Sequence, residues 1–193
     1  FRRYPGSQVI LFDKGLSARA AVLSMGGAHH RLGIGGGEDE DLAFQPLARI
    51  DDPAERAWAA EWLAALLVGE SVAVTPEVRD QIWSALESLA SAPVDERTIT
   101  GLTLLLQSHA LRLALAPYTL DGPYGRLLDA DREKLAFTDI LCFETEALME
   151  QKPAVAPVLS YLFHRLEERF DGRPTLLILD EAWIYLDHPL FAA

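Results

Sequence analysis

The stretch LLILDE at residues 176–181 decides the fold. Four consecutive apolar residues are typical of a central strand that is buried on both faces of a parallel sheet. Two acidic residues, Asp180 and Glu181, follow at once. In open parallel sheets, ligands bind in the crevice outside the carboxyl ends of the strands. The stretch therefore predicts an α/β fold with two carboxylates at its ligand-binding edge.

This acidic pair suits nucleotide hydrolysis. In P-loop hydrolases, an acid at this place holds the hydration shell of Mg²⁺ while a Gly-rich loop holds the phosphates. A neighbouring Glu can orient and deprotonate the attacking water. Because the pattern is short, a second interpretation stays open, in which the two carboxylates cap the segment after the strand.

The rest of the sheet is predicted from short apolar runs on both sides of a helical stretch. Residues 8–12 and 140–143 are expected to be buried strands. Between and after them the sequence predicts a helix over 16–25, a short strand over 29–32, a loop over 33–41 and a long amphipathic helix over 153–170.

The middle of the chain predicts helices. Asp52-Pro53 and Thr75-Pro76 each combine a capping side chain with a proline at the first helical position. The three tryptophans of this region, Trp58, Trp62 and Trp83, stand at helical spacings, which indicates core packing rather than a ligand site. Two shorter helices are expected over 100–107 and 109–116. The predicted organisation is an α/β core over 1–50, an all-α insertion over 51–131 and a return to the core over 132–193.

Composition excludes several classes. The 193 residues are 50% hydrophobic with a net charge of −12, which is typical of a soluble globular chain. No apolar run approaches the length of a membrane span. The single cysteine, Cys142, excludes a disulfide framework and a cysteine-based zinc site, and is expected to be an inert core residue. Adjacent His29 and His30 would face opposite sides of a strand and could not chelate one metal together.

The acidic charge is concentrated in the insertion, where thirteen Asp and Glu residues stand against five Lys and Arg. Such a surface repels phosphate backbones, so direct DNA binding by this segment is not expected. It is either an ordinary solvated helical face or an acidic docking face for a partner protein.

The phosphate-binding partner of the acidic pair is missing from the sequence. No G-x-x-x-x-G-K-[ST] motif occurs. The chain begins with Phe1 and ends about a dozen residues after the predicted strand. We therefore expect a piece of a larger protein, with its phosphate loop before Phe1, and no ATP hydrolysis by the piece alone.

Seven stretches in the same order along the chain resemble the large ATPases of type IV secretion systems, conjugal-transfer members in particular. They are FRRYPG (1–6), FDKG (12–15), LAFQPL (42–47), RAWAAEW (56–62), YTLDGP (118–123), GRLLD (125–129) and LDEAW (179–183).

The resemblance implies a partial RecA-like P-loop NTPase core, mostly a parallel sheet, with the all-α insertion. It implies ATP and Mg²⁺ as cofactors, with Asp180 organising Mg²⁺ through water and Glu181 as general base. Asp13 and Lys14 match a motif near the nucleotide and are assigned a supporting role.

The resemblance further implies a homo-oligomer in the cytoplasm, peripheral on the inner membrane, which acts with other secretion components in pilus assembly or substrate transfer. The alternative is a non-catalytic assembly module that docks another secretion component through its acidic insertion.

Overall fold

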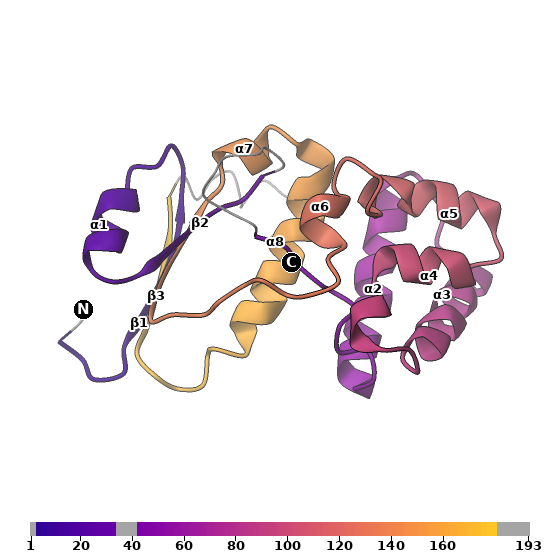
Figure 1. Cartoon of the computed structure of the whole chain (residues 1–193), viewed down its shortest axis with the longest axis horizontal. Coiled ribbons are helices and arrows are strands. Elements are labelled where there is room, and N and C mark those ends of the chain that lie inside the picture. The colour runs from indigo at the N-terminus through magenta and orange to yellow at the C-terminus, as the bar shows by residue number, and fades with distance from the viewer. Residues whose placement is uncertain (1–2, 34–41, 181–193) are drawn as a thin grey trace. The chain divides into compact units, whose positions relative to one another are not determined.

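The computed structural model describes residues 3–33 and 42–180. Residues 1–42 and 135–193 form an α/β unit, and residues 43–134 form a helical unit (Figure 1). The polypeptide therefore leaves the α/β unit, builds the helical unit and returns to the α/β unit.

The α/β unit is built on a four-stranded parallel sheet in the order β2-β3-β1-β4. The strands are β1 (Gln8–Asp13), β2 (Ala28–Arg31), β3 (Ile140–Glu144) and β4 (Thr175–Leu179). The strands expected over 8–12, 29–32, 140–143 and 176–179 are thus confirmed within one or two residues at each end. All neighbouring strands pair in parallel, so their carboxyl ends meet at one edge of the sheet.

The position of β4 corrects one expectation. Four apolar residues predicted a buried central strand, but within the described residues β4 lies at the edge of the sheet and pairs only with β1. Leu176, Leu177 and Ile178 are 36–40% exposed. A continuous apolar run indicates a strand, but it does not say which strands flank it.

Side chains of the sheet alternate between two differently covered faces. On one face, Val22 of α1 (Arg19–Ser24) packs with Ile140 and Cys142. On the other, the Phe12 ring stacks on Phe163 of α8 (Lys152–Glu167), with ring centroids 5.3 Å apart. Figure 1 shows these two helices on opposite sides of the sheet. A short helix, α7 (Glu146–Met149), follows β3.

Both helices are shorter than predicted. The expected helix over 16–25 begins only at Arg19, because Gly15 and Leu16 adopt positive φ angles that no α-helix tolerates. The expected helix over 153–170 ends at Glu167. Residues 34–41 of the expected loop lie outside the described residues.

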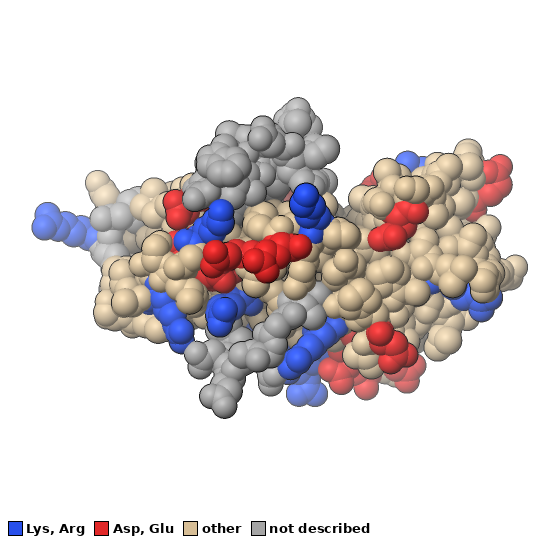
Figure 2. Space-filling model, turned by 90° about the horizontal axis from the view of Figure 1, so that it is seen from above, with Lys and Arg blue, Asp and Glu red and all other residues tan. Residues whose placement is uncertain are grey.

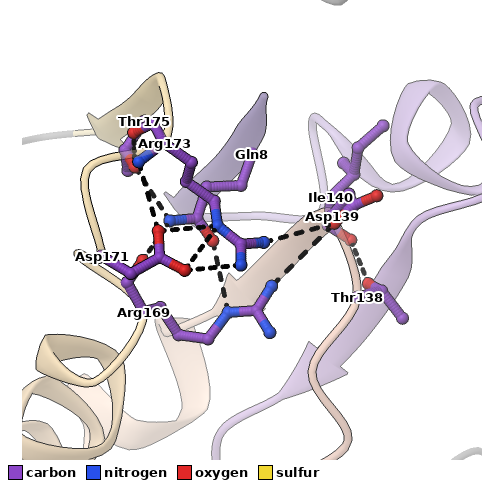
Figure 3. Close-up of polar contacts among 8 residues, drawn as sticks. All are labelled: Gln8, Thr138, Asp139, Ile140, Arg169, Asp171, Arg173 and Thr175. Atoms are coloured by element: carbon purple, nitrogen blue, oxygen red, sulfur yellow. Dashed lines mark hydrogen bonds and ion pairs between the residues drawn. The ribbon is translucent and has the colours of Figure 1, made fainter. Parts of the chain in front are cut away.

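A polar network holds the amino end of β4 in place (Figure 3). The buried amide of Gln8 donates to the carbonyl oxygen of Arg169 at 2.7 Å and to the hydroxyl of Thr175 at 2.8 Å, and it accepts from Nε of Arg169 at 3.2 Å. Beside it, the guanidinium of Arg173 donates to both carboxylate oxygens of Asp171. These bonds join the end of α8 and the start of β4 to the first strand.

The helical unit contains five α-helices among the described residues: α2 (Pro53–Gly69), α3 (Pro76–Leu89), α4 (Ile99–Leu105), α5 (His109–Leu115) and α6 (Gly125–Leu128). Two short 3₁₀ turns, Val94–Glu96 and Ala116–Tyr118, separate some of them. The side chains of Asp52 and Thr75 accept hydrogen bonds from the first turns of α2 and α3, as the sequence predicted. Trp62 is buried and stacks on Trp58, which confirms core packing at this pair. The expectation was wrong for Trp83, which is 40% exposed on α3.

The carboxylate of Asp129 joins two segments of this unit. It accepts hydrogen bonds from the backbone N–H groups of Ile99, Thr100 and Leu120. Burial raises the pKa of Asp129 above its ordinary value, although these hydrogen bonds act in the opposite direction. One buried side chain thus supports the start of α4 and the turn before α6.

Candidate functional site: the carboxyl edge of the sheet

Acidic side chains follow three neighbouring strands at the carboxyl edge of the sheet. Asp13 ends β1, Glu144 ends β3 and Asp180 comes directly after β4. In the strand register Asp13 is paired with Glu144. Figure 2 looks onto this end of the α/β unit from above and shows acidic and basic side chains beside each other. This is the edge at which open parallel sheets bind their ligands.

Asp180 is held at this edge through its backbone. Its N–H donates to the carbonyl oxygen of Phe12 at 2.8 Å, which extends the β1–β4 pairing by one bond beyond the strand. The residue itself is exposed. Asp180 therefore lies next to Asp13 in the sheet, with a carboxylate that solvent can reach. Glu181, the predicted general base, lies outside the described residues.

Asp13 has a partly structural role. It is 2% exposed. Its carboxylate accepts hydrogen bonds from the hydroxyl of Ser17 and, at 3.0 Å, from the backbone N–H of Ala18. These bonds close the turn that leads into α1. Lys14, the next residue, is half-buried in this same turn, so both residues predicted to support the site lie at the edge where Asp180 lies.

Glu144 was not singled out from the sequence. It is 1% exposed, and its carboxylate accepts from the N–H of Glu146 at 2.7 Å and, at 3.4 Å, from that of Gly15. Its second oxygen lies 4.0 Å from Nε of Arg31. The rule that drew attention to Asp180, an acid at the end of an apolar strand, would also have identified Glu144.

The sheet face under α1 brings three potential metal ligands together. Ligand atoms of Asp13, His29 and Cys142 all lie within 4.8 Å of one another, and all three residues are buried. Burial, followed by the negative charges of Asp13 and Glu144, raises the pKa of the Cys142 thiol to about 12. His30 lies on the opposite face, where its ring stacks on Phe143, as expected for adjacent histidines in a strand.

Within the described ranges, no helix combines the length and the apolar character that a membrane span requires.

Comparisons with known proteins agree with this fold. No model of a known protein family matches the chain. It is 40% identical over 195 aligned positions to a probable conjugal transfer protein TrbE of Sinorhizobium fredii and 40% identical to conjugal transfer protein TrbE of Rhizobium radiobacter. Almost all of this chain is covered in both, but only 29% and 24% of the relatives. The chain thus spans about a quarter of their length.

More distant relatives point the same way. The type IV secretion system protein virB4 of Bartonella henselae is 23% identical over 96% of this chain. The solved structure of VirB4 from Thermoanaerobacter pseudethanolicus matches with a TM-score of 0.66 at 20% identity, covering 93% of this chain and 54% of that one. At this identity the structural likeness concerns the fold.

The parallel sheet, and the helical unit that stands between β2 and β3 in the sequence, are consistent with a partial RecA-like core. Within this class, the chain is similar over nearly its whole length to TrbE proteins of conjugal transfer and, more distantly, to virB4 proteins of type IV secretion systems.

Proposed function

We propose that this chain is the central part of an ATPase that powers pilus assembly or substrate transfer in conjugation. The observation that carries the proposal is the bond from the Asp180 N–H to Phe12, since it fixes an exposed carboxylate at the ligand-binding edge beside Asp13. The similarity to TrbE and virB4 proteins supports the role in conjugation. The acidic side chains at the carboxyl edge of the sheet support ATP hydrolysis as the reaction.

The donors at this edge suit Mg²⁺. An exposed carboxylate offers the hard oxygen ligand that Mg²⁺ prefers, and solvent access lets the ion keep several of its waters. When bound, Mg²⁺ offsets the charge of the phosphates of ATP. In the proposed site, Asp180 holds that hydration shell and Glu181 takes the proton of the attacking water. Asp13 keeps the turn after β1 folded, which holds Lys14 near the edge.

The test replaces the two acids in the longer protein that contains this chain. Glu181→Gln keeps size and hydrogen bonding but removes the base, so we expect kcat to fall by about 10²–10⁴-fold. Asp180→Asn should raise the Mg²⁺ concentration required for half-maximal rate. The matched controls are Glu167→Gln at the end of α8 and Asp131→Asn in the helical unit, both exposed, and both should retain full turnover. Normal turnover by Glu181→Gln would overturn the assignment.

The isolated 193-residue chain is expected to hydrolyse no ATP above the background rate, because its sequence holds no phosphate-binding loop. The measurement is phosphate release with excess ATP and Mg²⁺. Turnover by the isolated chain that is abolished by Glu181→Gln would contradict this part of the proposal.

A non-catalytic docking role for the helical unit is the second candidate. Besides its excess of acidic residues, this unit leaves Leu104 and Leu113 at least 60% exposed. In this proposal the unit binds another secretion component while the whole protein forms a homo-oligomer at the cytoplasmic face of the inner membrane. DNA is not the expected ligand, because the acidic surface repels it.

The docking role is tested by reversing charge on α3. Asp80 and Glu87 are exposed and stand seven residues apart, so they share one helix face. Asp80→Lys combined with Glu87→Lys should lower conjugation frequency while ATP turnover of the purified protein stays unchanged. Unchanged conjugation would count against docking on this face.

A further inference from the structure

Three buried side chains of the α/β unit, Asp13, His29 and Cys142, lie close together. The proposed nucleotide chemistry gives them no common role. His29 and Cys142 are register partners on the neighbouring strands β2 and β3, so their side chains lie side by side on one face of the sheet. Asp13, two residues after Leu11 on β1, reaches the same face, because Leu11 is the register partner of Cys142. Three strands thus each contribute one metal-ligating side chain.

The bonding of these side chains leaves room for a ligand. His29 is 8% exposed, and within the described residues its Nε2 atom is buried without a hydrogen-bond partner. A buried polar nitrogen without a partner is unfavourable, and a bound ion would relieve that cost. Cys142 is 0% exposed. These buried side chains would therefore supply most of the ligands of an ion bound there.

We propose that Asp13, His29 and Cys142 form a metal site for Zn²⁺. Thiolate, imidazole and carboxylate are the three ligand types that zinc takes in proteins, and three protein ligands leave a fourth tetrahedral position for water. Ligands at about 2.0–2.3 Å from a tetrahedral ion stand roughly 3.6 Å apart. The present atoms lie within 4.8 Å of one another, so they would move closer together when the ion binds.

Binding of one Zn²⁺ ion releases one proton. The Cys142 thiol releases its proton to solvent as the bond between zinc and sulfur forms, while Asp13 binds as carboxylate and His29 as neutral imidazole. The ion would tie β1, β2 and β3 together and would fix Asp13 under α1. The inference is independent of ATP hydrolysis, so either can fail without the other.

The test uses Co²⁺ as a spectroscopic probe of the 193-residue chain. Cys142 is its only cysteine, so a sulfur-to-cobalt charge-transfer band can come from this site alone. We expect a band that saturates at one Co²⁺ per chain and disappears when one equivalent of Zn²⁺ is added. Absence of the band in the wild-type chain would overturn the proposal.

Variants then assign the ligands. Cys142→Ser should lose the band, and His29→Gln and Asp13→Asn should each weaken Co²⁺ binding at least 10-fold. His30→Gln is the matched control, since His30 is the next residue of the same strand on the other face, and it should bind as tightly as the wild type. Unchanged affinity in both His29→Gln and Asp13→Asn would overturn the site.

A second measurement covers variants that fold poorly. Zn²⁺ should raise the Tm of the wild-type chain and of His30→Gln, but not that of Cys142→Ala, whose small side chain packs in place of the thiol. Far-ultraviolet circular dichroism identifies any unfolded variant. An equal rise in Tm for Cys142→Ala would place zinc elsewhere and refute the proposal.

Discussion

The backbone N–H of Asp180 donates to the carbonyl oxygen of Phe12 at 2.8 Å, although the two residues stand 168 positions apart in the chain. This bond ties the acidic pair after the last strand to the first strand. Any loosening of β4 therefore changes the position of the proposed Mg²⁺ acid. The amide of Gln8 holds β4 at its other end, as Figure 3 shows.

Gln8→Ala is predicted to destabilise the α/β unit. The substitution leaves the carbonyl oxygen of Arg169 and the hydroxyl of Thr175 without their buried donor, at a cost of about 1–3 kcal/mol. Urea unfolding of the two proteins measures this difference. Gln81→Ala, on the exposed side of α3, is the control and should change stability by less than about 0.5 kcal/mol. Equal midpoints for the two variants would contradict the role of Gln8.

Asp171 is predicted to titrate far below the ordinary value of an aspartate. Hydrogen bonds from the side chain of Arg173 lower the pKa of Asp171 to about 2. A lowered pKa means that the pair stabilises the fold fully above the ordinary Asp value near 4, and that this stabilisation is lost as the pH falls towards 2. Carboxyl chemical shifts followed by NMR measure the titration. Arg173→Gln should return the midpoint to about 4, and a midpoint near 4 in the wild type would refute the pairing.

The helices of the helical unit could be predicted because the residues that start each helix are adjacent in the sequence. Asp52 and Thr75 each precede a proline and cap the helix that begins there, within three residues of sequence. The strands were predictable for the same reason, since β1, β3 and β4 are short apolar runs. The edge position of β4 was not, because it depends on which strands pair, and pairing joins segments more than 100 residues apart.

Some residues of the α/β unit with possible functional roles could likewise be found from the sequence, whereas others are brought together only by strand pairing. Asp180 follows an apolar run and could be found from the sequence, and Glu144 obeys the same rule although it was overlooked. The grouping of His29 with Cys142 could not be found, because only the β2–β3 register places them side by side. The sequence therefore predicted Cys142 as an inert core residue and excluded a cysteine-based zinc site by counting cysteines, which considers neither a histidine nor an aspartate from another strand.

Asp129 is predicted to tolerate Asn but not Ala. Asp129→Ala leaves several buried N–H groups without an acceptor and should cost about 2–4 kcal/mol. In Asp129→Asn the side-chain oxygen still accepts, so the loss should be smaller. Because burial raises the pKa of Asp129, the carboxyl group favours the folded state most at low pH and less as the pH rises through its folded pKa. The free energy of unfolding of the wild type should therefore fall relative to that of Asp129→Asn between pH 4 and pH 7. A pH-independent difference would contradict the burial argument.

Gly125 is predicted to be irreplaceable, whereas Gly69 is not. A Cβ atom on Gly125 would overlap the backbone carbonyl of Thr119 and press on the nitrogen of Leu120, and backbone atoms cannot rotate away. Gly125→Ala must therefore displace the turn whose Leu120 N–H bonds to Asp129, so we expect a loss of about 1–3 kcal/mol or more. Gly69 is the last residue of α2, where a Cβ meets nothing within 4 Å. Gly69→Ala should stabilise the protein by about 0.5–1 kcal/mol, because alanine restricts the unfolded chain. Thermal unfolding measures both changes. An unchanged Tm for Gly125→Ala would contradict the prediction, because it would show that the backbone of this turn moves to accept the added Cβ atom.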